Sequence, residues 1–178
     1  MADGYPARVA LAYPASLAVA GAGMAIAGYV LAQTGLPAWL ALALMGGGLA
    51  LWTLLEYLLH RFVLHGLAPF QAWHEHHHRV PLERIRIPLV FSVPMVLVLL
   101  VAPALLLRNV AFGAAVSLGL LAGEVLQEAV HERLHRGAAG VLEGQRRHHD
   151  FHHAEDARRA YGTLTDFWDR RFHTAPPA

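Results

Sequence analysis

Long apolar segments without charged residues make up most of the first 135 positions of this chain. No Asp, Glu, Lys or Arg lies between Arg8 and Glu56, and residues 87–107 also carry no charge. A bilayer core about 30 Å thick is crossed by roughly 20 apolar residues in a helix. We therefore predict four membrane-spanning helices, at about 11–33, 36–60, 87–107 and 110–135.

Turn-forming residues fall between the predicted helices and set their ends. Residues 34–37 (Thr-Gly-Leu-Pro) predict the first turn, residues 108–109 predict the second, and Gly137 predicts the end of the last helix. Residues 61–86 and 136–173 are polar and have helical potential around their histidines. The sequence thus predicts two helical hairpins that carry a polar, helical cap.

The basic residues are distributed unevenly around these helices. All fourteen are Arg, and only Arg108 falls on one side of the predicted membrane. Cytoplasmic segments carry the excess of Lys and Arg, so we predict that both termini and the cap are cytoplasmic. The expected fold is all-α, an integral membrane four-helix transmembrane bundle with a cytoplasmic His-rich cap, formed as a single domain by residues 1–178. The expected location is the bacterial inner membrane, and no nucleic-acid partner is expected.

Twelve of the thirteen histidines are packed into four short clusters. Imidazole binds iron, zinc or copper without adding charge, and the chain has no cysteine that could supply thiolate ligands. A structural zinc ion takes about four protein ligands, so ten or more clustered histidines predict two metal ions. The clusters read HRFVLH from His60, HEHHH from His74, HERLH from His131 and HHDFHH from His148.

Helical spacing predicts which histidines share an ion. Residues four apart lie on nearly the same face of an α-helix, and residues three apart are close neighbours. The pairs that can share an ion in this way are His131 with His135, His74 with His78, and His149 with His152.

Other spacings separate the rings. His77 and His153 each follow or precede a ligand directly in sequence, so they point elsewhere and are expected to reach the second ion. His60 and His65 are five residues apart and diverge by about 140° on an α-helix. We therefore expect these two histidines to serve different ions.

At these residues the chain resembles the fatty acid hydroxylase/sterol desaturase superfamily of integral-membrane di-iron enzymes. The superfamily pattern Hx4H, HxxHH, Hx3H and HxxHH is met as HRFVLH, HEHHH, HERLH and HDFHH. The resemblance covers about residues 51–172 and includes the flanking segments EYLLHRF (56–62), PLERIRIP (81–88) and YGTLTDFWDRRF (161–172).

The resemblance implies two iron ions, although zinc could occupy the same nitrogens. It assigns one ion to His65, His74, His78, His149 and His152. It assigns the other to His60, His77, His131, His135 and His153. Three histidines lie outside the pattern, and we expect them at the surface or beside the ligands. They are His76, His148 and His173.

The implied activity is hydroxylation, or desaturation, of a lipid alkyl chain by O2. A fatty acyl or sterol-like lipid from the bilayer is the expected substrate. No haem-binding cytochrome domain is recognised in the sequence, so we expect a separate electron donor of the ferredoxin or cytochrome type with its reductase.

Three alternatives are open at this point. Only eight residues separate the first two clusters, which is closer to the carotenoid ring hydroxylases of the same superfamily, although the third cluster and residues 161–169 favour the fatty acid and sterol branch. HERLH and HEHHH also match the HExxH motif of zinc proteases, with Glu132 as the base in the first, but this interpretation leaves most histidines unused. A membrane metal carrier would place polar ligands inside the spans, and the first and third spans contain no His, Asp or Glu.

Carboxylates within the predicted spans, close to the clusters, are candidates for orienting the ligands. Glu56 lies four residues before His60, and Glu128 lies three before His131. Ligand histidines commonly donate their second N–H to such a group, so we predict this role for both glutamates. For Glu124 the sequence favours neither this role nor another. For Asp166, Trp168 and Asp169 we expect a helix-capping or packing role.

Overall fold

The computed structural model describes residues 9–137 and 140–177, which are mostly helical. The chain divides into two compact units. We call the first the apolar unit, which comprises Val9–Trp52 and Arg86–Leu126. We call the second the histidine unit, which comprises Thr53–Ile85 and the described residues from Gln127 onward.

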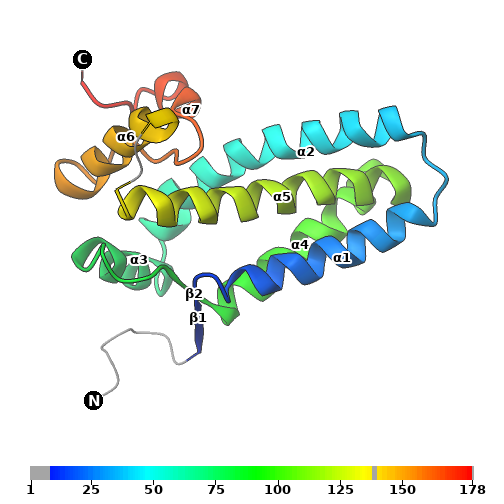
Figure 1. Ribbon diagram of the computed structural model, residues 1–178, viewed down its shortest axis with the longest axis horizontal. Helices are drawn as coiled ribbons and strands as arrows, with labels where there is room; N and C mark the ends of the chain where they lie inside the picture. Colours follow the sequence, from blue (N-terminus) through cyan, green and yellow to red (C-terminus); the bar gives the residue numbers. More distant parts are fainter. Residues whose placement is uncertain (1–8, 138–139, 178) are drawn as a thin grey trace. The chain divides into compact units, whose positions relative to one another are not determined.

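Four long helices make up the apolar unit (Figure 1). These are α1 (Leu17–Ala32), the first part of α2 (Ala38–Leu58), α4 (Leu89–Leu107) and most of α5 (Val110–His135). The α2 and α5 backbones approach closely, because a Cβ atom on Gly119 would lie 2.0 Å from the carbonyl oxygen of Met45. A Cβ atom on Gly123 would likewise meet the Trp52 side chain at 2.6 Å. The GxxxG step thus serves helix packing, as this spacing of small residues predicts.

Among the residues that the structure describes, three helices are long and apolar enough to cross a membrane. They are α2 with its extension to Leu64, α4 and α5, at 27, 19 and 26 residues. The first predicted span is wrong at its start, because α1 has only 16 residues. The preceding Ala10–Ala12 form strand β1, which pairs antiparallel with strand β2 (Arg86–Pro88). A fourth crossing by α1 stays a prediction.

Shorter helices form the histidine unit. They are the π-helix η1 (Leu59–Leu64), α3 (Phe70–Arg79), the 3-10 turn η2 (Gly140–Leu142), α6 (Glu143–Ala154) and α7 (Phe167–Arg171). They surround the C-terminal end of α5, with α3 and α6 beside it in Figure 1. As predicted, α5 ends at His135, and Gly137 follows with a positive φ of 77°. Glycine adopts this left-handed conformation without steric cost, which is why it ends helices so often.

Candidate metal centre

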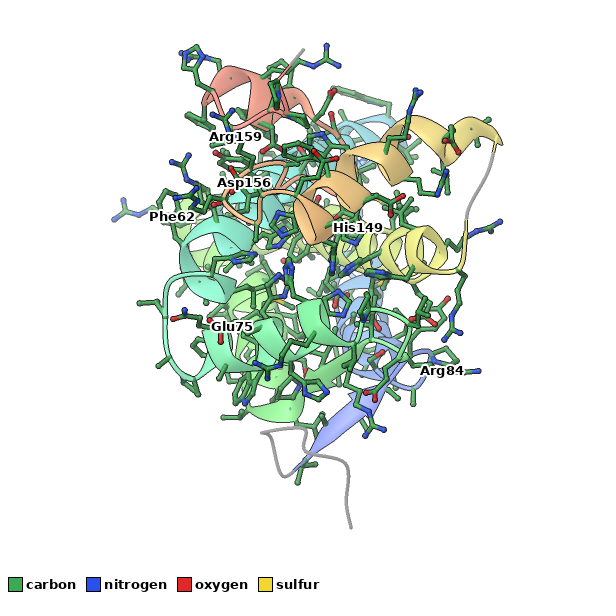
Figure 2. The ribbon with its side chains drawn as sticks, turned by 90° about the vertical axis from the view of Figure 1, so that its left-hand side faces the viewer. Phe62, Glu75, Arg84, His149, Asp156 and Arg159 are labelled. Atoms are coloured by element: carbon green, nitrogen blue, oxygen red, sulfur yellow. The ribbon has the colours of Figure 1, made fainter. Side chains whose placement is uncertain are left out.

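Ten histidine rings converge inside the histidine unit. They come from η1 and the residue after it, from α3, from the end of α5 and from α6, and Figure 2 shows ring nitrogens gathered there with His149 among them. In each of two groups of five, the ligand nitrogens all lie within 4.8 Å of one another. The first group consists of His60, His65, His74, His78 and His152. The second group consists of His77, His131, His135, His149 and His153.

Most of the expected pairings recur in these groups. His74 with His78 and His131 with His135 share a group, as their spacing of four residues predicts. His77 also lies with His153 in the second group, with ring centroids 4.8 Å apart. All ten histidines of the sequence pattern therefore lie in one of the two groups. Two of them lie in the other group from the one that the family resemblance implies.

His60 is the first of the two exchanged residues. It lies with His65 in the first group rather than with His131 in the second. The cause is the π-helical turn, in which the N–H of His65 donates to the carbonyl oxygen of His60 at 3.1 Å. An i→i+5 hydrogen bond makes residues five apart one turn apart, so the divergence expected for an α-helix does not arise. The expectation that these two histidines serve different ions was wrong.

His149 is the second exchanged residue. Its ring centroid is 4.5 Å from that of His153 and 6.4 Å from that of His152. Nε2 of His149 lies 2.9 Å from Nε2 of His135, and Nε2 of His152 lies 3.1 Å from Nε2 of His65. On α6, His149 therefore shares a group with His153, four residues on, and not with His152, three residues on. The predicted pairing of His149 with His152 was therefore wrong.

The convergence of ring nitrogens fits a bound cation. Nε2 atoms of His77, His131 and His135 form a triangle with all three edges 3.1 Å. Nitrogens at that separation can all lie about 2.0–2.1 Å from one ion, the usual zinc–nitrogen distance. Both ring nitrogens of His153 are buried without a hydrogen-bond partner among the described residues. Such a nitrogen is costly unless it ligates something, so the donor set suits a metal.

Three rings of the first group that lie outside the candidate spans, those of His65, His78 and His152, favour the neutral form. Burial is the main cause, because desolvation disfavours the charged imidazolium form. It lowers the pKa of His65 and His152 to about 4. Burial, together with the nearby His152, lowers the pKa of His78 to about 3. The neutral ring is the form that can bind a metal ion.

Two backbone carbonyl groups orient rings of the first group. Nδ1 of His60 donates to the carbonyl oxygen of Tyr161, and Nδ1 of His152 donates to that of Arg159, each at 2.6 Å. Because a carbonyl oxygen can only accept, both rings carry their proton on Nδ1 and keep the Nε2 lone pair for the group. Figure 2 labels Arg159 in the loop that follows α6.

The carboxylates near the clusters have different surroundings. Glu56 is buried, and its Oε1 accepts from the backbone N–H of Thr163 at 2.6 Å. The ring N–H of His60 donates to the carbonyl oxygen of Tyr161 and not to Glu56. Glu56 therefore contacts the loop rather than a ring. Glu124 and Glu128 are also buried, and an orienting role for Glu128 stays a prediction.

Glu132, the glutamate of the HExxH interpretation, is occupied by structural partners. Its Oε2 accepts from the backbone N–H of Ile85 at 3.1 Å, and its Oε1 accepts two hydrogen bonds from Arg136. The carboxylate thus ties α5 to the end of the connector after α3. A carboxylate held in this way is poorly suited to act as a protease base.

The three histidines outside the pattern belong to neither group. Nε2 of His76 lies 3.6 Å from Glu83, Nε2 of His148 lies 3.1 Å from Asp169, and His173 is exposed.

The C-terminal segment has the expected packing contacts. Trp168 donates to Thr53 at 2.9 Å, and Asp166 accepts from Arg170 on the same helix. Asp169 is fully buried, and its contacts extend toward the first group in a way that sequence reasoning missed.

Comparison with known proteins identifies the family. Residues 45–174 match the family described as Fatty acid hydroxylase. The chain belongs to this family. It is 33% identical over 144 residues to fatty acid 2-hydroxylase of Rattus norvegicus, which covers 73% of this chain and 38% of the relative. It is 32% identical over 169 residues to the ceramide very long chain fatty acid hydroxylase scs7 of Schizosaccharomyces pombe, covering 84% and 47%.

Further comparisons agree with this assignment. The dihydroceramide fatty acyl 2-hydroxylase FAH2 of Arabidopsis thaliana is 33% identical over 142 residues, which covers 72% of this chain and 59% of that protein. A solved structure titled full-length scs7p, with only the hydroxylase domain visible, superposes with a TM-score of 0.71 at 24% identity. That match covers 91% of this chain and 67% of the other, and it shows a shared fold.

The chain spans well under two thirds of the length of the curated relatives it matches. The family resemblance read from the histidine pattern is confirmed by these comparisons. They give no support to a carotenoid ring hydroxylase, an intramembrane metalloprotease or a metal carrier.

Proposed function

We propose that this protein is a membrane-bound oxidoreductase that hydroxylates the acyl chain of a lipid, using two iron ions, O2 and external electrons. The observation that carries the proposal is the convergence of ten histidine rings in two groups of five. One metal ion cannot use so many ligands, whereas two ions use all of them. Membership of the fatty acid hydroxylase family supports the lipid substrate.

The ions would supply the chemistry that the side chains of this protein lack, the oxidation of an unactivated C–H bond. The histidines contribute neutral nitrogen ligands, a donor set that suits iron and that zinc could also occupy. The loop carbonyls of Arg159 and Tyr161 fix the tautomers of His152 and His60, so the Nε2 lone pairs remain available. Burial of His74 and of these two rings limits the access of water to the first group.

The names of the relatives support a particular position of attack. They include fatty acid 2-hydroxylase and dihydroceramide fatty acyl 2-hydroxylase. Carbon 2 is the carbon next to the acyl carbonyl group. We therefore propose 2-hydroxylation of a fatty acyl chain, in preference to desaturation or to a sterol-like substrate.

The sidedness of the protein follows from its arginines. Every basic residue except Arg108 lies on the side of the histidine clusters in the predicted topology. A cytoplasmic histidine unit would be accessible to a separate ferredoxin- or cytochrome-type donor and its reductase. We place the protein in the bacterial inner membrane with both termini in the cytoplasm.

Metal content and product formation test this proposal together. The protein is purified from iron-supplemented cells as the wild type, as His135→Ala and as the control His173→Ala, which alters an exposed histidine outside both groups. We expect two metal ions per chain in the wild type and the control, and 2-hydroxylated acyl chains in the lipids of the cells that express them. His135→Ala should abolish the product. A single tightly bound ion in the wild type, or full activity of His135→Ala, would contradict the proposal.

A further inference from the structure

The loop of residues 159–163 is held by two buried carboxylates. Oδ1 of Asp169 accepts from the backbone N–H of Tyr161 at 2.9 Å, and Oδ2 accepts from that of Gly162 at 2.8 Å. Oε1 of Glu56 accepts from the next N–H, that of Thr163, at 2.6 Å. Three consecutive backbone donors therefore end on carboxylate oxygens inside the histidine unit.

The same short loop presents its carbonyl groups to the histidines. The carbonyl oxygens of Arg159 and Tyr161 accept from His152 and His60, and both of these rings belong to the first group. The backbone N–H of Tyr161 thus donates to the carboxylate of Asp169, and its carbonyl oxygen accepts from the ring N–H of His60. A displacement of its peptide backbone would be felt by the His60 ring directly, since only one hydrogen bond separates them.

Asp169 is itself fixed from several directions. Its Oδ1 accepts from Thr174 Oγ1 at 2.8 Å, and its Oδ2 lies 3.1 Å from Nε2 of His148. Burial alone would raise the pKa of Asp169, but these hydrogen bonds and those from the loop lower it below its ordinary value. The side chain is therefore an anion at neutral pH, and an anion is the stronger acceptor for backbone N–H groups.

The loop packs so closely at Gly162 that no side chain fits there. A Cβ atom at this position would lie 2.1 Å from the carbonyl oxygen of Thr165 and 3.1 Å from Oδ2 of Asp169. The N–H of Ala160 is also bonded to the carbonyl oxygen of Thr174 at 2.8 Å. The carboxylate, the loop and the residues that follow α7 therefore form one hydrogen-bonded assembly.

We propose that Asp169 is a positioning residue for the first histidine group alone. It holds the loop so that the carbonyl groups of Arg159 and Tyr161 keep His152 and His60 directed at their metal ion. This inference rests on the proposed function, because it assumes that each histidine group binds a metal ion. It differs from the packing role expected from the sequence, since simple packing would support both groups equally.

The test measures metal binding without any assay of activity. The full-length protein in detergent is stripped with a chelator and titrated with Co²⁺, and binding is followed by visible absorption and by metal analysis. Asp169→Asn keeps the size of the side chain but replaces one acceptor oxygen with an amide that cannot accept from an N–H group. The matched control is Asp166→Asn at the N-cap of the same helix, because the side chain of Asp166 is 41% exposed and pairs with Arg170.

Two backgrounds separate the groups. In His135→Ala, which damages the second group, Asp169→Asn should weaken the remaining Co²⁺ equivalent by about 10–100-fold, the usual loss when the support of a ligand is removed. In His65→Ala, which damages the first group, Asp169→Asn should leave the remaining equivalent within twofold. Asp166→Asn should change neither background.

Each outcome has a defined meaning. Equal weakening in both backgrounds, or no weakening in either, would overturn the role of Asp169. If Asp169→Asn does not fold, Thr174→Val provides the test, because it removes the hydroxyl that donates to Asp169 and also contacts Tyr57, and it should weaken only the first-group equivalent, by about fivefold. A wild type that binds fewer than two equivalents would instead refute the proposed function, whatever the variants do.

Discussion

The backbone N–H of His65 donates to the carbonyl oxygen of His60 at 3.1 Å, and this π-helical hydrogen bond brings the two rings to the same histidine group. Their ring centroids are 5.1 Å apart and nearly stacked. In an α-helix the same two residues would point in directions about 140° apart. One extra residue in a helical turn therefore determines which histidine group His60 joins, and π-turns are frequent at functional sites.

The first prediction concerns this grouping. We expect the double variant His60→Ala/His65→Ala to retain one metal ion per chain, because both changes fall in the first group. The double variant His60→Ala/His149→Ala should lose both ions, because it damages one ligand of each group. Metal analysis of the purified proteins after dialysis against a chelator provides the measurement. Loss of both ions from the His60→Ala/His65→Ala variant would instead restore the expected pairing, in which these two histidines serve different ions.

Much of this arrangement could be predicted from the sequence, because it depends on side-chain chemistry and helical periodicity. The two polar turns, the end of α5 at Gly137 and the pairs His74–His78 and His131–His135 all follow from local rules. The grouping of His149 could not be settled, since spacings of three and four residues both permit a shared ion. The structure of α6 selects the spacing of four.

Other features could not be read from the sequence for a different reason. The groups that orient His60 and His152 are backbone carbonyls, and every residue has one. No residue type marks them in the sequence. Glu56, which the sequence favours for this role, instead accepts a hydrogen bond from the loop that carries both carbonyl groups. The start of α1 was missed because Ala10–Ala12 are as apolar as a helix that spans a membrane, and only their pairing with β2 shows them to be a strand.

The second prediction concerns topology. The chain has no cysteine, so single cysteines can be introduced without background labelling. His173→Cys, at an exposed position beyond α7, should react with an impermeant maleimide only when the cytoplasmic side is accessible. Gln33→Cys, at the exposed turn after α1, should react only from the opposite side if α2, α4 and α5 each cross the membrane. Labelling of both cysteines from one side would refute the three crossings by α2, α4 and α5 between them.

The third prediction separates two glutamates on α5. Glu128 is buried one turn before His131, and Glu128→Gln should weaken metal retention or activity by about 10–100-fold through loss of a charged partner near the ligands. Glu132→Gln should lower stability by about 1 kcal/mol, because it weakens the contacts with Ile85 and Arg136, and should leave metal content intact. Metal analysis and thermal unfolding of both variants provide the comparison. An inactive Glu132→Gln with full metal content, beside a normal Glu128→Gln, would favour hydrolytic chemistry instead.

The last prediction concerns the pH dependence of the metal-free protein. In the folded state the pKa of His65 and of His152 is about 4, and that of His78 is about 3, because burial disfavours their charged forms. In the unfolded chain each returns to about 6.5. Between these values the unfolded state binds more protons than the folded state, so stability falls as the pH falls. The contribution is complete above about pH 6.5 and is lost progressively toward pH 4.

Thermal unfolding in detergent and chelator between pH 7.5 and pH 5.0 should therefore show a midpoint that decreases on acidification. His65→Gln removes one of the groups that titrate and should make the dependence shallower, even though it lowers the midpoint at neutral pH. His173→Gln serves as the control, since His173 is exposed and its replacement should leave the slope unchanged. A midpoint that stays constant or increases toward pH 5 would mean that these rings are not buried in their neutral form, and the ligand geometry described for the first group would then be wrong.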